Sequence, residues 1–154
     1  YLHDIGNVIN RIDHAQSGAV MAFRILDNLG ADADELSTII SAIGNHDEST
    51  AYPVNEVAAA LILADKTDVR RSRVRNGDFS TFDIHDRVNY AVTDAKLKIE
   101  KDRSVIALNL QIDEKICSMF DYFEIFLERM LLCRKSAEVL GTTFKLTVNG
   151  RKVL

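Results

Sequence analysis

Apolar side chains recur every three or four residues through the first half of the chain, a spacing typical of amphipathic helices. This spacing predicts one helix over residues 13–29 and a second over residues 34–44, with Asp34 as its N-cap. A third helix is expected to begin at Pro53, because proline is favoured in the first turn of a helix. We expect that helix to become polar and basic along its length and to break at residues 76–77.

After residue 77, strict alternation of apolar and polar side chains replaces the helical period. A short helix capped by Asp83 precedes two alternating stretches joined by a charged turn around Asp102, a pattern that predicts a β-hairpin with one buried face. A long helix and a last alternating stretch follow, and Asn149-Gly150 is a strong signal for a tight turn. The expected ranges are 95–101 and 105–112 for the hairpin, 114–140 for the long helix and 144–148 for the last strand.

These elements predict an α+β protein in two parts. Residues 1–76 are expected to form an all-α helical bundle, and residues 77–154 a β-β-α-β unit. We expect the strands to make a small antiparallel sheet with the long helix covering one face. The edge strands and the broad aromatic surface of that helix indicate an accessory role for the second part, as a homodimer interface or a gate over a substrate site.

Composition and charge narrow the class of protein. Of the 154 residues, 47% are hydrophobic and 27% are charged, as in ordinary globular proteins. The formal net charge of −4 argues against binding to nucleic acid or to an anionic membrane, and no apolar run approaches the roughly 18 residues of a membrane span. Cys117 and Cys133 lie on one predicted helix, about 24 Å apart by helical rise. They cannot pair with each other, so we expect a reducing cytoplasm.

Residues with metal-binding side chains gather in the first half of the chain. His3-Asp4, His14 and His46 each lie next to the end of a predicted helix, and Asp65 falls on the apolar face of the third helix. An isolated carboxylate on such a face would be costly unless it were paired or bound to a metal. Helix ends that carry histidine and aspartate toward a common pocket are one way in which an all-α scaffold builds a metal site.

Imidazole and carboxylate ligands together suit divalent transition metals such as manganese, iron, zinc or nickel. Two ions that share a carboxylate would lower the pKa of the water between them and hold the oxygens of a phosphoryl group. In this scheme His3 and Asp65 bind one ion, His14 and His46 bind the other, and Asp4 bridges the two. Asp4 and Asp65 are therefore also the candidate catalytic residues.

Four motifs, LHDIGN, HAQSGA, NHDE and LILADKTDVR, resemble in this order the HD-domain superfamily of metal-dependent phosphohydrolases. The resemblance covers roughly the first half of the chain. It implies a helical domain whose metal ligands are a His-Asp pair, two later histidines and a final aspartate. It also implies hydrolysis of phosphate esters through a metal-bound hydroxide. The matching residues in this sequence are His3, Asp4, His14, His46 and Asp65.

Two positions depart from the family pattern. The family's first histidine lies on a helix upstream of the His-Asp pair, and no residue of this sequence corresponds to it. We therefore expect the chain to start inside the helix that carries the pair, with a segment bearing that histidine ahead of Tyr1 in the intact protein. Asn7 stands where many relatives carry lysine, a change that we expect to alter substrate contacts.

Basic residues that follow the final aspartate are candidates for binding substrate phosphate. Lys66 and Arg70 are four residues apart and would share one face of a helix, and a guanidinium group can hold phosphate oxygens in a bidentate manner. A solvated basic helix end explains the same residues equally well. Asp47 and Glu48, beside His46, could shuttle a proton, orient that imidazole or simply form a charged loop.

The leading interpretation is an enzyme, a binuclear metal phosphohydrolase that acts on a nucleotide or another small phosphorylated molecule. The alternative is a catalytically degenerate domain that binds a nucleotide or a protein partner as a regulatory module. A third interpretation is an interaction scaffold in which the same residues bind one structural ion. The second His-Asp pair, His85-Asp86, has no apolar run before it and no partner histidines after it, so we expect no metal there.

Overall fold

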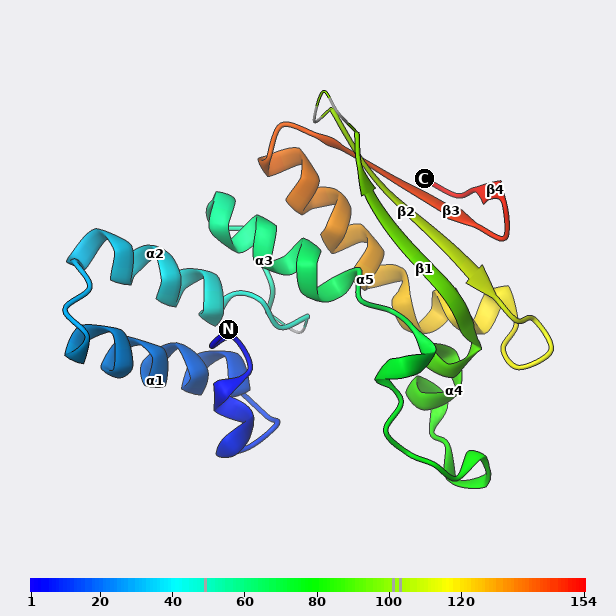
Figure 1. Ribbon diagram of the computed structural model, residues 1–154, viewed down its shortest axis with the longest axis horizontal. Helices are drawn as coiled ribbons and strands as arrows, with labels where there is room; N and C mark the ends of the chain where they lie inside the picture. Colours follow the sequence, from blue (N-terminus) through cyan, green and yellow to red (C-terminus); the bar gives the residue numbers. More distant parts are fainter. Residues whose placement is uncertain (49, 101, 103) are drawn as a thin grey trace.

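The structure confirms the α+β class (Figure 1). Among the described residues, helices form the first half of the chain, and a four-stranded sheet with one long helix forms most of the second. The computed structural model describes residues 1–48, 50–100, 102 and 104–154. The α-helices are α1 (His14–Asn28), α2 (Ala33–Gly44), α3 (Glu56–Lys66), α4 (Ile84–Ala91) and α5 (Met119–Val139). The strands are β1 (Val92–Ile99), β2 (Val105–Ile112), β3 (Thr143–Val148) and β4 (Arg151–Lys152). The short 3₁₀ helices are η1 (Ile5–Val8), η2 (Arg71–Arg73) and η3 (Phe79–Thr81).

Side-chain caps move the starts of two predicted helices. The predicted N-cap Asp34 is wrong, because the carboxylate of Asp32 accepts hydrogen bonds from the backbone N–H groups of Asp34 and Glu35, at 2.9 and 3.0 Å. The third helix does not begin at Pro53. It begins after Asn55, whose side-chain oxygen accepts a hydrogen bond from the backbone N–H of Ala58 at 2.8 Å. In both places a polar side chain that can reach the free N–H groups decides where the helix starts.

The third helix also ends earlier than the sequence predicts. It stops at Lys66, and Thr67 turns its hydroxyl back onto the carbonyl of Leu63 at 2.6 Å. The basic stretch that follows is a turn, held by Asp68, whose carboxylate accepts a hydrogen bond from Arg70 Nε at 2.6 Å. Lys66 and Arg70 therefore do not share a helical face, and the argument from their four-residue spacing is wrong.

The second part contains the predicted elements with one error of direction. Helix α4 is capped by Asp83 as predicted, and β1 pairs with β2 as an antiparallel hairpin. Strand β3, however, lies parallel to β2, so the prediction of an antiparallel sheet is wrong (Figure 1). The connection between them is α5, and a helix that runs back along the sheet returns the chain to its starting end, so the next strand enters in the same direction. Lys101, the last residue of the first predicted strand, lies outside the described residues.

The predicted turn at Asn149-Gly150 joins β3 to β4, which pair as antiparallel strands. Both turn residues have positive φ, 50° and 75°, as a two-residue hairpin turn of the primed type requires. The Asn149 side chain also donates to the carbonyl of Ile112 and accepts from its N–H, at 3.0 and 2.8 Å. This turn therefore fixes the end of β2 as well as the start of β4.

Helix α5 covers one face of the sheet and forms the main core with it. Its buried side chains include Tyr122, Phe126, Met130 and Cys133, and they pack against apolar side chains of β2 and β3. Leu63 of α3 and Val69 belong to the same buried cluster, so the helical part and the sheet part share apolar contacts. The helix begins at Met119 rather than at residue 114, because Ser118 and Asp121 form a capping box there.

Among the described residues, no helix combines the length and the apolar character that crossing a membrane requires. Helix α5 is 21 residues long, but it carries charged residues along its exposed side.

We expect Cys133 to make the fold sensitive to alkaline pH. Burial raises the pKa of its thiol from 9.0 to about 12, so above about pH 9 the unfolded chain releases a proton that the folded chain keeps. Stability is therefore lost as pH rises from 9 toward 12, by up to about 1.4 kcal/mol per pH unit. Cys133→Ala should show a shallower decline in the free energy of unfolding between about pH 9 and pH 10.5, measured by urea denaturation. Parallel pH profiles for the variant and the parent would contradict this prediction.

Candidate metal centre

The His3-Asp4 pair lies in a turn directly before η1, and the predicted α-helix around it is absent from the structure. The 3₁₀ helix that follows packs against the start of α1. Gly6 is buried in this contact, while Val8 and Ile9 are exposed. The pair is thus held by a short, tight segment whose position depends on how closely it approaches α1.

That approach depends on two glycines. A Cβ atom added to Gly6 would lie 2.0 Å from the carbonyl oxygen of His14 and 2.7 Å from the backbone nitrogen of Gly18. A Cβ atom on Gly18 would in turn lie 3.3 Å from the carbonyl oxygen of His3. Backbone therefore packs directly on backbone where the His3-Asp4 turn meets α1. Gly6 belongs to the LHDIGN motif, but the role of Gly18 was not predicted from the sequence. Its signal is its position four residues after His14, on the same face of the helix.

The two buried histidines have the same hydrogen-bonding arrangement. His14, the first residue of α1, has its Nδ1 atom 3.0 Å from the carbonyl oxygen of Arg11, and His46, just after α2, has its Nδ1 atom 2.6 Å from that of Ile43. A carbonyl oxygen can only accept, so each Nδ1 carries a proton, and in the neutral ring Nε2 then carries the lone pair. This is the arrangement in which protein histidines usually bind metals, with the second nitrogen donating to a carbonyl.

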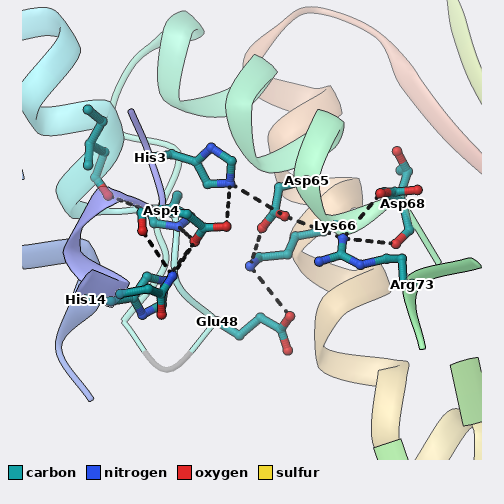
Figure 2. A network of polar contacts seen from close by, with 12 residues as sticks. His3, Asp4, His14, Glu48, Asp65, Lys66, Asp68 and Arg73 are labelled. Atoms are coloured by element: carbon teal, nitrogen blue, oxygen red, sulfur yellow. Dashed lines mark hydrogen bonds and ion pairs between the residues drawn. The ribbon is translucent and has the colours of Figure 1, made fainter. Parts of the chain in front are cut away.

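All three N-terminal histidines turn Nε2 toward the carboxylate of Asp4 (Figure 2 labels two of them). His3 Nε2 lies 3.2 Å from Oδ2, whereas the Nε2 atoms of His14 and His46 lie 3.4 and 3.7 Å from Oδ1. Oδ2 of Asp4 thus faces His3, and Oδ1 faces His14 and His46. This matches the bridging position that the sequence scheme gives to Asp4.

Asp65, on the last turn of α3, completes the group. Its Oδ1 atom lies 3.9 Å from His3 Nε2 (Figure 2). The ligand-type atoms form two overlapping sets, each with all its atoms within 4.8 Å of one another. His46 belongs to both sets, so it lies between the two candidate positions instead of on one side, as the scheme assumed. The two sets are His3, His46 and Asp65, and Asp4, His14 and His46.

The donor set fits divalent cations. With Nδ1 protonated, the Nε2 atoms of His14 and His46 are acceptors that face another acceptor, the Oδ1 atom of Asp4. Such contacts are repulsive unless a cation or a proton lies between the atoms. A proton on His46 is disfavoured, because burial, together with the nearby Lys66 and His3, lowers its pKa below the ordinary 6.5. A metal ion that accepts both lone pairs would satisfy the group.

Asn7 contacts the same carboxylate. Its side-chain amide donates to Oδ1 of Asp4 at 3.1 Å and to the Asp4 carbonyl oxygen at 3.1 Å. The Asn7 side chain therefore helps to orient the central carboxylate. From the sequence, we expected Asn7 to alter contacts with the substrate instead.

Lys66 lies behind the candidate centre. Its ammonium nitrogen is 2.6 Å from Oδ2 of Asp65 and 3.6 Å from Oε1 of Glu48, and only 6% of its side chain is exposed (Figure 2). Burial alone would raise the pKa of Asp65, but the Lys66 ammonium outweighs burial, and the pKa lies below its ordinary value. The Lys66 ammonium thus pairs with two carboxylates. From the sequence, we expected it to bind phosphate instead.

A cavity of about 1000 Å³ opens beside His3, Asp4 and Asp65. Arg70, a predicted phosphate-binding residue, lines this cavity and is also paired with Asp68. Arg73 lines it too, with its Nη1 atom 3.9 Å from Oδ1 of Asp65. The sequence analysis missed two further arginines of the wall, Arg11 and Arg75. The basic run RRSRVR was the available signal for Arg75.

His85 and Asp86 lie in α4, outside both ligand sets. The His85 side chain is exposed, and the helix is capped by Asp83 rather than by the pair. This pair offers a matched control for experiments on His3 and Asp4.

No protein-family profile matches the chain, and comparison with curated proteins and with solved structures gives no match either.

We expect Gly6→Ala to destabilise the protein by at least about 1–3 kcal/mol, the usual cost of forcing an extra methyl group into a packed site. The new Cβ atom would meet backbone atoms of α1 that cannot move aside. Gly77→Ala is the matched control, because a Cβ atom there meets nothing within 4 Å and its φ is not in the left-handed region. Urea unfolding of both variants measures the difference. Equal stabilities would show that the Gly6 contact is not tight.

Proposed function

We propose that the protein is a metal-dependent phosphohydrolase that acts on a nucleotide or another small phosphorylated molecule. The observation that carries the proposal is the convergence of three imidazole Nε2 atoms on the two oxygens of Asp4, with Asp65 beside them. This ligand set suits manganese, iron, zinc or nickel. It also agrees with the ordered motifs that resemble the HD-domain superfamily.

Two divalent ions bound here would lower the pKa of a water molecule and offset the charge of a phosphoryl group. The chain's own residues provide the rest. His3, His14, His46 and Asp65 would hold the ions, and Asp4 would bridge them. The backbone carbonyls of Arg11 and Ile43 accept from Nδ1 of His14 and His46 and leave Nε2 of each ring aimed at the site. The protein thereby orients its ligands before any ion binds.

The cavity beside the ligands supports a phosphorylated substrate. Arg70 and Arg73 line it next to Asp65, and guanidinium groups suit phosphate oxygens geometrically. Both pair with Asp68 in the structure, at 2.6 and 3.3 Å, so a substrate phosphate would compete with that carboxylate. Lys66 is not among the residues that line the cavity. We therefore assign phosphate binding to Arg70 and Arg73.

The proposal also includes a homodimer formed through the second part. Phe120 and Leu127 of α5 expose 78% and 47% of their surface, which is costly for apolar side chains on a charged helix. Both cysteines are free and buried, which suits the reducing cytoplasm that we propose as the location.

Metal content tests the proposal first. Protein purified without chelator or affinity metal should contain about two transition-metal ions per chain by elemental mass spectrometry. Asp4→Asn should lose most of them, because the amide cannot bridge two cations. Asp86→Asn is the matched control from the second His-Asp pair and should keep them. An absence of metal, even after soaking with manganese, iron and zinc, would overturn the proposal.

Activity tests it second. With the metal-loaded protein, a panel of nucleotides and sugar phosphates should reveal phosphate release, and His14→Ala should reduce the rate by at least about 100-fold. His85→Ala, the exposed control, should retain the parent rate. Metal binding without turnover on any phosphate ester would favour the regulatory alternative, a domain that binds a ligand but does not hydrolyse it.

A further inference from the structure

Four charged side chains of alternating sign connect the candidate metal centre to the long helix. They run from Asp65 through Lys66 and Glu48 to Arg129, and we call them the charge relay. Asp65 and Lys66 end α3, Glu48 lies two residues after His46, and Arg129 is on α5. The relay joins residues 81 positions apart in sequence, because Arg129 contacts Glu48 directly.

Lys66 is the buried link of the relay. Its side chain is 6% exposed, and a buried ammonium is stable only when carboxylates surround it. Asp65 Oδ2 lies 2.6 Å from the ammonium nitrogen, while Glu48 Oε1 lies 3.6 Å away on the other side (Figure 2). The contact with Lys66 occupies Oδ2 and leaves Oδ1 of Asp65 facing His3 Nε2. Lys66 therefore determines which oxygen of Asp65 is available as a ligand.

Arg129 fixes the far end of the relay. Its Nε atom donates to Glu48 Oε1 at 2.7 Å, and its Nη2 atom contacts the same oxygen. The guanidinium carbon lies 4.6 Å from the centre of the Phe126 ring, one turn earlier on α5. Phe126 is buried in the core against the sheet. The position of Glu48 is therefore set by α5, a helix that also packs against α3 and the sheet.

We propose that Arg129 is a positioning residue for the candidate metal centre, acting on Asp65 through Glu48 and Lys66. The inference rests on the proposed function, since it assumes that Asp65 binds a metal ion. It assigns a role to the second part of the chain, which contributes none of the ligands. The sheet and α5 hold the outer end of a series of ion pairs that orients one ligand.

A positioning role of Arg129 and a purely electrostatic effect of its charge predict opposite changes in metal affinity. Arg129→Gln removes a positive charge, and a change of charge alone would strengthen the binding of a cation. If Arg129 instead orients Asp65, its loss lets Glu48 and Lys66 shift, and metal affinity falls. Changes to groups that orient a ligand typically reduce metal affinity by about 10–100-fold.

The experiment measures Co²⁺ affinity and the visible absorption spectrum of the Co²⁺-loaded protein for the parent and three variants. Arg129→Gln should weaken Co²⁺ binding by about tenfold and change the spectrum, since the coordination geometry at Asp65 changes. Arg129→Lys keeps the charge but offers Glu48 one nitrogen instead of two, so its affinity should fall between those of the parent and Arg129→Gln. Arg134→Gln removes the same charge from an exposed position of α5 and should match the parent.

Circular dichroism confirms first that each variant is folded, and a merely structural role would lower stability without changing the cobalt spectrum of folded protein. Equal or tighter Co²⁺ binding by Arg129→Gln, with a parental spectrum, would overturn the inference alone. A parent protein that binds no Co²⁺, Mn²⁺ or Zn²⁺ would instead overturn the proposed function. The two failures are therefore distinguishable.

Discussion

The crowding of acceptor atoms around Asp4 is the constraint on which the rest of the site depends. Two imidazoles, each with Nδ1 fixed by a backbone carbonyl, point lone pairs at a carboxylate oxygen. Proteins seldom leave such groups facing one another, because each acceptor needs a donor or a cation. The ligand side chains come from the N-terminal turn and from segments at the ends of α1, α2 and α3. A shared cation is what would make their convergence favourable.

The fold provides that convergence through contacts that are themselves unusual. Backbone meets backbone at Gly6 and Gly18, which sets the distance between the His3-Asp4 turn and α1. Asp13, just before His14, has a left-handed backbone with φ of 56°, a conformation that aspartate tolerates better than most residues. The His3-Asp4 pair is therefore held by close backbone contacts with α1, whereas His14 and His46 are buried. This explains how exposed segments can present ligands in a defined arrangement.

The sequence predicted most elements and singled out ligand-type residues that converge in the structure, because periodicity and motif order are local signals. It did not predict the direction of β3, since alternation marks a strand but not its partner or orientation. Helix starts were shifted by two or more residues where Asp32, Asn55 and Ser118 compete as caps. The role of Lys66 was misjudged because its buried ammonium pairs with Glu48, a residue from another segment. Residue spacing within one helix cannot reveal such a contact.

The contact between Glu48 and Arg129 has a consequence for how the protein is made. A ribosome delivers the first half of the chain, with all the ligand-type residues of the site, well before residue 129 emerges, and a helical segment can fold during that interval. Until α5 is made, Arg129 cannot hold Glu48 beside Lys66. Leu63 and Val69 also lack the core that covers them. The newly made site therefore lacks these contacts for a time that the rate of translation sets. Final assembly of the ligand-type residues becomes a late step, which couples the geometry of the candidate metal centre to completion of the sheet.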